Sequence, residues 1–290
     1  MDNKQILSVC VRTYNQARYI SQGLDSVLAQ KTTFNYELIV SDDCSKDGTI
    51  EILREYQQKY PQKIRLLLGD ANVGGPANFR RVIEASQAKY LAFLDGDDYY
   101  TDVYKLQKQV DFLESNSQYA ACFHNVFNQS GDKFVSLFMP LDFKSVHTAE
   151  DVISKKWFLP IHSVVLRRHL VSFPDWYEKV MNDDYVVNLS VVMHGPYYYM
   201  PDVMAVYRHH DSNISNQYSN LILIDTQLKT ILEGFKSIYP AEYEKCFDNK
   251  IAFYENEICR LEMDRKFPWR KWLRIKTYKR MLRSFLRSRI

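Results

Sequence analysis

Short apolar runs alternate with helix-spaced segments along the first part of this chain. Each run has the length of one buried strand, and the runs are Leu7–Val11, Tyr36–Val40, Ile64–Leu68 and Tyr90–Leu94. Between the runs, apolar residues recur every three or four positions, as on the buried face of a helix. These sets are Ile20, Leu24, Val27 and Leu28, then Ile50, Leu53 and Tyr56, then Phe79, Val82 and Ile83. Strands that alternate with helices predict an α/β protein with a mostly parallel, Rossmann-like sheet flanked by helices.

A polar cluster follows each of the four apolar runs. The clusters are Arg12–Asn15, Ser41–Ser45, Gly69–Gly75 and Asp95–Asp98. Ligands of open α/β sheets bind outside the carboxyl ends of the strands, where all four clusters would converge. A single polar turn is ordinary, but four of them at one edge of a sheet predict a binding site.

The cluster Asp95–Asp98, with the sequence Asp-Gly-Asp-Asp, places three carboxylates at the end of a buried strand. Carboxylates in this position suit a divalent metal ion, which in turn holds a phosphate-bearing substrate. The alternative is a solvated turn, because glycine and aspartate are common turn residues. Taken alone, the cluster leaves these interpretations balanced, and the other three clusters favour the metal.

The other clusters carry groups that bind nucleotides. Tyr14 offers a flat face for a base, and Asp42 or Asp43 could accept the imide N–H of uracil or thymine. Asn72 and Gly74 lie in a segment whose glycines let the backbone approach a ligand closely. Each feature also has an ordinary explanation, as a core-edge aromatic residue, as turn or cap acids, and as a plain turn.

Together these motifs resemble those of the inverting GT-A fold glycosyltransferases, specifically the large family 2 group. The motifs that carry the resemblance are Val9–Asn15, Leu24–Gln30, Ile39–Thr49, Asn72–Gly75 and Phe93–Tyr100. The resemblance covers about the first 125 residues. It implies a UDP-sugar or dTDP-sugar donor, with Mg²⁺ or Mn²⁺ bound at the Asp-x-Asp element.

The resemblance also implies a role for individual residues. The predicted donor-nucleotide site comprises Thr13, Tyr14, Asn15, Asp42, Asp43, Asn72, Gly74, Asp95 and Arg208. Within it, Asp42 pairs with the base imide and Asp95 lies near the ribose and the metal. Asp97 is implied as the direct metal ligand, with Asp98 as a further ligand.

The segment Asn182–Tyr185 supplies a candidate for a catalytic base, which is needed because an acceptor hydroxyl must lose its proton as it attacks. Apolar residues at helix spacing follow, so the acids open a helix, where helix capping is the alternative explanation. Family members commonly carry Glu-Asp and an aromatic residue at this distance. The resemblance therefore implies that Asp184 is the base, and that Asp183, in place of the usual Glu, contacts the acceptor.

Two other segments are similar to family elements. Val206–Asp211 resembles a Tyr-Arg-x-His run, which implies that Arg208 binds the diphosphate and that His210 is a metal ligand. A packed or surface histidine is the alternative. Pro160–Val165 would lie between the two catalytic halves, in the region that faces the acceptor in relatives, so His162 is predicted to contact the acceptor.

Charge is distributed unevenly along the chain. Residues 266–290 carry ten basic side chains and no acidic one, whereas the rest of the chain carries 28 basic and 35 acidic side chains, a net charge of −7. Aromatic and apolar residues recur among these basic residues at near-helical spacing, which predicts a helix on an anionic membrane surface, each charge contributing about 1 kcal/mol. A helix packed on the body is the next alternative, and the aromatic residues make nucleic acid the least favoured partner.

Three features that the sequence lacks narrow its expected location. No run of about 18 apolar residues is present, the first residues do not resemble a secretory signal, and the five cysteines lack metal-ligand spacing. A cytoplasmic location is therefore expected, at the inner face of the membrane where the basic tail binds it. We expect a GT-A domain over 1–216, with a nucleotide-sugar half (1–125) and an acceptor half (126–216). A helical region with the basic tail follows over 217–290, its two helices joined around Tyr239-Pro240.

The sequence thus predicts a glycosyltransferase that moves a sugar from a UDP- or dTDP-sugar to a hydroxyl of a cell-surface polysaccharide or lipid-linked glycan. The predicted reaction is a metal-dependent displacement with inversion. One alternative is a nucleotidyltransferase, although the first strand is not followed by a Gly-rich, Lys-bearing loop for a triphosphate. The other is a non-catalytic module that binds nucleotide sugars or membranes.

Overall fold

The computed structural model describes residues 5–140, 142–155, 159–210 and 221–267. The chain divides into two compact units, Met1–Asn213 and Ile214–Ile290. The domain boundary predicted after residue 216 falls within 211–220, outside the described residues.

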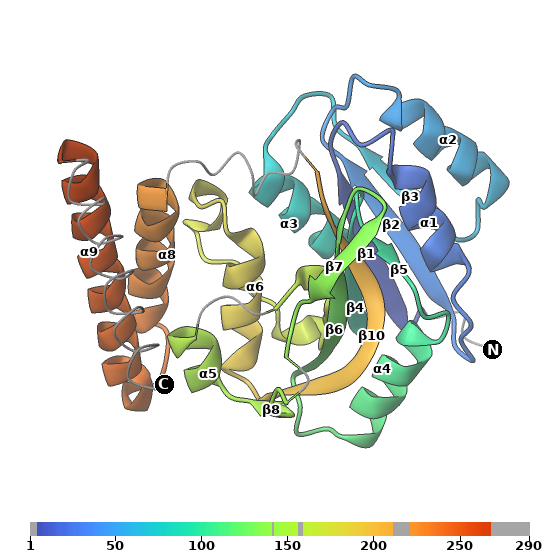
Figure 1. The fold of residues 1–290 in the computed structure, drawn as a ribbon. Helices are drawn as coiled ribbons and strands as arrows, with labels where there is room; N and C mark the ends of the chain where they lie inside the picture. Colours follow the sequence, from blue (N-terminus) through green and yellow to red (C-terminus); the bar gives the residue numbers. More distant parts are fainter. Residues whose placement is uncertain (1–4, 141, 156–158, 211–220, 268–290) are drawn as a thin grey trace, which may run out of the picture. The chain divides into compact units, whose positions relative to one another are not determined.

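The first unit is built on one sheet with helices on both faces (Figure 1). Its first strands are β1 (Leu7–Thr13), β2 (Tyr36–Asp42), β3 (Ile64–Leu68) and β4 (Tyr90–Asp95). The connecting helices are α1 (Ile20–Leu28), α2 (Thr49–Lys59) and α3 (Gly75–Ala85). These four strands are parallel, in the order β3-β2-β1-β4. The strands and helices predicted from the apolar pattern are confirmed.

Strand β1 lies where the strand order reverses, with β2 on one side and β4 on the other. Open α/β sheets bind their ligands at such a point, beyond the carboxyl ends of the strands. Alternate residues of β1 face opposite layers: Val9 and Val11 pack in the core with α1 and α2, whereas Cys10 Sγ lies 3.7 Å from a backbone oxygen of α3. The alternation continues to the end of the strand, so Arg12 faces the layer of α3 and Thr13 faces the opposite layer.

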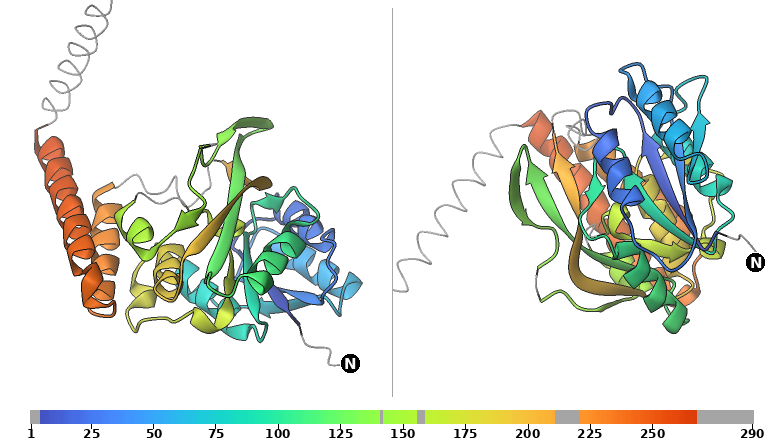
Figure 2. Two further views of the ribbon diagram at one scale, coloured as in Figure 1. Left: turned by 90° about the horizontal axis from the view of Figure 1, so that it is seen from below. Right: turned by 90° about the vertical axis from the view of Figure 1, so that its right-hand side faces the viewer.

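The rest of the first unit extends this sheet beyond β4. The added strands are β5 (Tyr99–Tyr100), β6 (Ala121–Ser130), β7 (Lys133–Leu137), β8 (Val146–His147), β9 (Val165–Arg167) and β10 (Tyr197–His209). The added helices are α4 (Lys105–Ser115), α5 (Ala149–Ser154) and α6 (Asp183–Val192). The order continues through β9, β6 and β10 to β5, and Figure 2 shows the β6–β7 hairpin, in green, projecting from the sheet. At the end of β10, Val206 pairs with Tyr99, so β10 returns to the acidic turn that follows β4.

The second unit contains α8 (Leu221–Lys236) and α9 (Glu244–Lys266), on either side of Tyr239-Pro240 as predicted. The two helices pack together through rings, because the centroid of Tyr239 lies 6.0 Å from Phe235 and 5.0 Å from Phe247. The predicted basic amphipathic helix lies almost wholly in 268–290, outside the described residues. Within the part of the chain that the structure describes, no helix has both the length and the apolarity to cross a membrane.

Candidate active site

The loops that follow β1 and β2 are bonded to each other. Asn15, with a φ of 52°, donates its backbone N–H to Ser45 Oγ, and its Oδ1 accepts the N–H of Lys46, both at 2.8 Å. Its neighbour Tyr14 is 46% exposed and presents its ring to solvent. Thr13 is buried, and no described residue gives its Oγ1 a hydrogen-bond partner. Asn15 therefore holds the loop, whereas Tyr14 is available for stacking.

Asp42 ends β2 and contacts the loop that follows it. Its side chain is fully buried, and its two carboxylate oxygens accept the backbone N–H and the hydroxyl of Ser45 at 2.8 and 2.5 Å. Asp43, also buried, accepts the N–H groups of Val73 and Gly74 at 2.8 and 2.9 Å. Both acids hold loops together, which is the turn interpretation, and the pairing of Asp42 with a base imide stays a prediction.

The third loop reaches the same edge. Gly74 has a φ of 90°, a conformation that glycine adopts without strain, and α3 starts at the next residue. Asn72 is exposed at the tip of this loop. The contacts from Asp43 fix Gly74 beside the end of β2, so this segment of predicted donor residues does lie at the carboxyl edge of the sheet.

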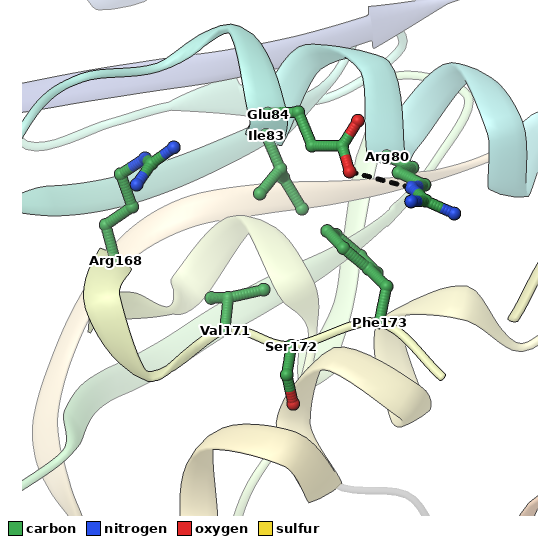
Figure 3. Close-up of a pocket in the computed structure, with 7 residues that line it drawn as sticks. All are labelled: Arg80, Ile83, Glu84, Arg168, Val171, Ser172 and Phe173. Atoms are coloured by element: carbon green, nitrogen blue, oxygen red, sulfur yellow. Dashed lines mark hydrogen bonds and ion pairs between the residues drawn. The ribbon is translucent and has the colours of Figure 1, made fainter. Parts of the chain in front are cut away.

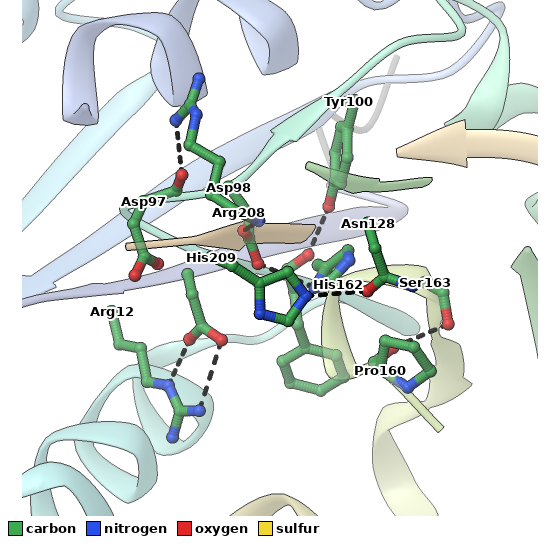
Figure 4. A network of polar contacts seen from close by, with 12 residues as sticks. Arg12, Asp97, Asp98, Tyr100, Asn128, Pro160, His162, Ser163, Arg208 and His209 are labelled. Carbon is green, nitrogen blue, oxygen red and sulfur yellow. Dashed lines mark hydrogen bonds and ion pairs between the residues drawn. The ribbon is translucent and has the colours of Figure 1, made fainter. Parts of the chain in front are cut away.

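Arg12 connects the two halves of the site. The strand register places it opposite Asp95, and its Nε lies 2.5 Å from Asp95 Oδ1. Its Nη1 lies 2.6 Å from Oδ2 of Asp183, the first residue of α6, and the guanidinium stacks 4.6 Å above the ring of Phe79. Figure 4 shows this guanidinium next to the acidic turn. The sequence places Arg12 in a polar cluster but indicates no role for it. The alternation of side chains along β1 could have indicated one, because it directs Arg12 to the layer of α3 and α6.

Replacing Arg12 with methionine is expected to lower the free energy of unfolding by about 2–4 kcal/mol. Asp183 is only 3% exposed and would lose the cation that compensates its charge. Urea unfolding measures the change. The double variant Arg12→Met/Asp183→Asn should recover part of the loss, because no buried carboxylate is then left unpaired. Equal losses in the single and double variants would contradict a coupled pair.

Asp97 and His210 meet beside this bridge. Asp97 Oδ2 lies 3.0 Å from His210 Nε2, and both side chains are largely buried. The imidazole stacks on the ring of Tyr19, with centroids 4.6 Å apart and an interplanar angle of 26°. Residues 113 positions apart in the chain are thus brought together, and their role as metal ligands stays a prediction.

The pair fits a divalent cation that is completed by a ligand. Among the described residues, no group of three or more histidine, cysteine or acidic side chains is arranged to hold a metal ion alone. Mg²⁺ is usually bound by only one or two carboxylates together with substrate phosphates and water, and carboxylates also suit Mn²⁺. Asp97 and His210 would hold such a cation, and the diphosphate of a nucleotide would supply the remaining oxygens.

Arg208 is directed at the protein rather than outward. Its Nη1 donates to the backbone oxygen of Asp97 at 2.5 Å and its Nη2 donates to Gln22. The guanidinium lies over the rings of Tyr99 and Tyr19, 4.5 and 5.2 Å from their centroids. These contacts make Arg208 a support of the Asp97 backbone, and its role as a direct diphosphate partner stays a prediction.

Gly96 separates the acids of the turn in a crowded position. A Cβ there would lie 2.9 Å from Thr13 Oγ1 and 3.0 Å from Ile20 Cδ1, and would also strike the side chain of Gln16. The variant Gly96→Ala is therefore expected to displace the turn, to lower the free energy of unfolding by about 1–3 kcal/mol and to weaken Mn²⁺ binding. Gly75→Ala is the matched control, because a Cβ there meets only Asp183 at 3.9 Å. Similar stability and Mn²⁺ affinity in the two variants would contradict the expected crowding.

Asp98 and His162 lie beneath the turn, away from solvent. Asp98 Oδ1 accepts the backbone N–H of Arg208 at 2.8 Å, and its Oδ2 lies 3.0 Å from His162 Nδ1. The Asp98 and His162 side chains are 0% and 2% exposed. Both side chains are labelled in Figure 4, and their roles as a further metal ligand (Asp98) and as an acceptor contact (His162) stay predictions.

Asp184 lies in the same electrostatic cluster as Arg12 and Asp183. Burial, and secondly the charge of Asp183, raise the pKa of Asp184 to about 7, while Arg12 opposes the rise. Asp183, in contrast, forms an ion pair with the Arg12 guanidinium through its Oδ2, and its Oδ1 accepts the N–H of Asp184 at 2.8 Å. Two neighbouring carboxylates are thus held in different environments, and a carboxylate with a pKa near 7 is suited to general base catalysis.

The raised pKa gives a pH dependence with a definite sign. Asp184 accepts a proton only in its ionised form, and its folded pKa of about 7 means that this form is lost below pH 7. We expect the kcat/KM of sugar transfer to rise about tenfold per pH unit below pH 7 and to level off above it. Mn²⁺ binding, followed over the same pH range, separates this limb from a change in metal affinity. A kcat/KM that stays constant from pH 5 to pH 8 would contradict this assignment.

A separate cavity of about 270 Å³ lies along α3, away from the predicted site residues. Figure 3 shows its lining, in which Arg80 pairs with Glu84 at 2.8 Å and the Phe173 ring lies below them. None of the residues assigned above to donor, metal or base lines this cavity.

The sheet with its β3-β2-β1-β4 half, the acidic turn after β4 and the returning strand β10 define the class of fold, that of the GT-A glycosyltransferases. A family model described as Glycosyl transferase family 2 matches residues 8–162, just over half of the chain. The chain belongs to the glycosyltransferase family 2.

The chain is similar to one mycobacterial protein in sequence and to two solved structures in fold. The uncharacterized protein Rv1520 of Mycobacterium tuberculosis is 38% identical over 210 residues, which are 72% of this chain but 60% of that protein's length. Among solved structures, TarS 1–349 of Staphylococcus aureus with UDP-GlcNAc has a TM-score of 0.60 at 15% identity, covering 86% of this chain and 80% of that one. The mannosyltransferase PcManGT of Pyrobaculum calidifontis, with GDP-Man and Mn²⁺, has a TM-score of 0.61 at 17% identity, covering 95% and 85%.

Proposed function

We propose that this glycosyltransferase moves a sugar from a UDP- or dTDP-sugar to a hydroxyl acceptor, with inversion at the anomeric carbon and with Mn²⁺ or Mg²⁺ as cofactor. The observation that carries the proposal is the Arg12 bridge, which joins Asp95 on the donor side to Asp183 beside the proposed base. Related structures with UDP-GlcNAc, or with GDP-Man and Mn²⁺, support a nucleotide-sugar donor and a divalent cation.

The reaction is a single displacement. Asp184 accepts the proton of the acceptor hydroxyl while the hydroxyl oxygen forms a bond to the anomeric carbon. The bond from that carbon to the nucleoside diphosphate breaks, and the diphosphate leaves with its bonding electrons. A cation held by Asp97 and His210 would neutralise the charge on the leaving diphosphate.

Other residues of this chain arrange the reactants. Arg12 keeps Asp183 and Asp95 together, and Asp183 remains a proposed contact for the acceptor. The exposed ring of Tyr14 is the proposed stacking surface for the base, and the segment of Asn72 and Gly74 is the proposed cover of the nucleotide.

The acceptor is proposed to be a cell-surface polysaccharide or a lipid-linked glycan. TarS, 40% identical to this chain over 96 residues, is named as a poly(ribitol-phosphate) β-N-acetylglucosaminyltransferase. The basic and aromatic residues of 266–290 support a peripheral position on an anionic membrane at the cytoplasmic face. Deleting these residues should then abolish binding to anionic vesicles, and unchanged binding would refute this part of the proposal.

Release of nucleoside diphosphate from a panel of UDP-, dTDP- and GDP-sugars tests the proposed donor. With Mn²⁺ present, the uracil or thymine donors should be turned over and the guanine donors should not. A parallel assay with nucleoside triphosphates and a sugar phosphate separates a nucleotidyltransferase, which would release pyrophosphate. No turnover of any sugar nucleotide, with intact binding, would support the non-catalytic module instead.

A further inference from the structure

The turn after β4 and the end of β10 are joined at a buried point. Tyr99 and Tyr100 of β5 pair with Val206 and Ala205 of β10, and the ladder ends where Asp98 Oδ1 accepts the N–H of Arg208 at 2.8 Å. This bond connects residues 110 positions apart. Because Asp98 directly follows Asp97 in the chain, this bond holds the β10 backbone at Arg208 close to Asp97.

His162 faces the other oxygen of Asp98 at ion-pair distance. Its Nδ1 lies 3.0 Å from Asp98 Oδ2, and it belongs to the short 3₁₀-helix Ile161–Ser163. The imidazole is nearly parallel to the ring of Tyr207, with centroids 5.8 Å apart and an interplanar angle of 14°. A buried carboxylate with one oxygen on a backbone N–H and the other facing an imidazole has little freedom to rotate.

The contacts of Asp98 with Arg208 and His162, which we call the Asp98 anchor, affect both segments that supply the proposed cation site. Arg208, held by Asp98 through its backbone, returns its guanidinium to the backbone oxygen of Asp97. Two residues further, His210 stacks on Tyr19 and places Nε2 3.0 Å from Asp97 Oδ2. Asp97 lies one residue before Asp98, and His210 lies two residues after Arg208. The distance between the Asp97 and His210 side chains therefore depends on the Asp98–Arg208 bond.

We propose that Asp98 and His162 act as a buried positioning pair that holds Asp97 and His210 at the separation a divalent cation requires. The inference deepens the proposed function and rests on it. It assigns both residues to the support of the cation site, whereas a direct ligand or an acceptor contact would need side chains that face the ligand. Groups that orient metal ligands typically change metal affinity about 10- to 100-fold when they are removed.

Two substitutions of His162 test the pair, because they differ only in which ring nitrogen they replace. In His162→Asn the amide nitrogen takes the position of Nδ1, and in His162→Gln it takes the position of Nε2, which does not face Asp98. We expect Mn²⁺ in the presence of UDP, measured by electron paramagnetic resonance of the free ion, to bind His162→Asn within about threefold of wild type. Binding to His162→Gln should be about tenfold weaker or more.

A matched control is His124→Gln, which changes another fully buried histidine whose Nδ1 lies 2.7 Å from the backbone oxygen of Asn125. It should lose thermal stability without losing Mn²⁺ affinity. Unchanged Mn²⁺ affinity in a folded His162→Gln, or equal losses in all three variants, would overturn the positioning role. A raised acceptor KM with unchanged Mn²⁺ affinity would likewise overturn it, in favour of an acceptor contact. Wild-type protein that binds no Mn²⁺ with UDP or dTDP would instead refute the proposed function itself.

Discussion

Replacing Asp184 with asparagine is expected to lower kcat by a factor of about 10²–10⁴, the usual contribution of a positioned general base. The asparagine side chain keeps the size of the residue and its ability to accept the N–H of Tyr185, which Asp184 accepts at 2.8 Å. It cannot accept a proton from the acceptor hydroxyl. The KM for the donor and its calorimetric affinity should stay within a few-fold of wild type, because the donor binds at the other end of the Arg12 bridge.

Asp175→Asn is the control for this substitution, since it neutralises an exposed acid just before α6. It should leave kcat unchanged. A second readout is the pH profile: the limb near pH 7 should be absent from the residual activity of Asp184→Asn. Transfer at the wild-type rate by a folded Asp184→Asn would remove this residue from the role of base.

Replacing Asp97 with asparagine should lower kcat/KM by a factor of about 100 or more, and most of the loss should come from metal-dependent donor binding. Asp97 supplies a carboxylate that lies against His210, and the neutral amide binds Mn²⁺ and Mg²⁺ more weakly. Saturating Mn²⁺ should recover part of the activity. The affinity of the variant for Mn²⁺ is measured in the presence of UDP.

Asp132→Asn, at an exposed position in the β6–β7 hairpin, is the matched control and should bind Mn²⁺ as wild type does. Urea unfolding of Asp97→Asn shows whether the turn is intact, because the Arg208 contact goes to the backbone oxygen of residue 97 and does not need its carboxylate. If a folded Asp97→Asn keeps wild-type metal dependence, the cation is bound elsewhere.

Much of the fold was predictable because its signals are local. β1, β2 and β4 are buried on both faces and are therefore mostly apolar runs, and α1 and α3 each present one apolar stripe. The rule that ligands bind beyond the carboxyl ends of parallel strands placed the four polar clusters at one edge. This prediction does not depend on the orientation of any side chain, and the parallel order of β3, β2, β1 and β4 confirms the predicted sheet.

The roles of single acids were not predictable in the same way. Asp97 and Asp98 are adjacent in sequence and identical in type, yet one faces His210 and the other faces His162 beneath the turn. Asp42 differs from an exposed turn acid only by its burial against Ser45. These directions are set by contacts with residues 3 to 113 positions away, which a motif does not contain.

The most direct test of a nucleotide site built on Asp97 is calorimetric titration of the protein with UDP and with dTDP, each with and without Mn²⁺. One of the two diphosphates should bind, its affinity should depend on Mn²⁺, and the dependence should be lost in Asp97→Asn. Absence of binding by both diphosphates in the presence of Mn²⁺, or binding that is indifferent to Mn²⁺ and to Asp97, would contradict a metal-dependent UDP- or dTDP-sugar transferase.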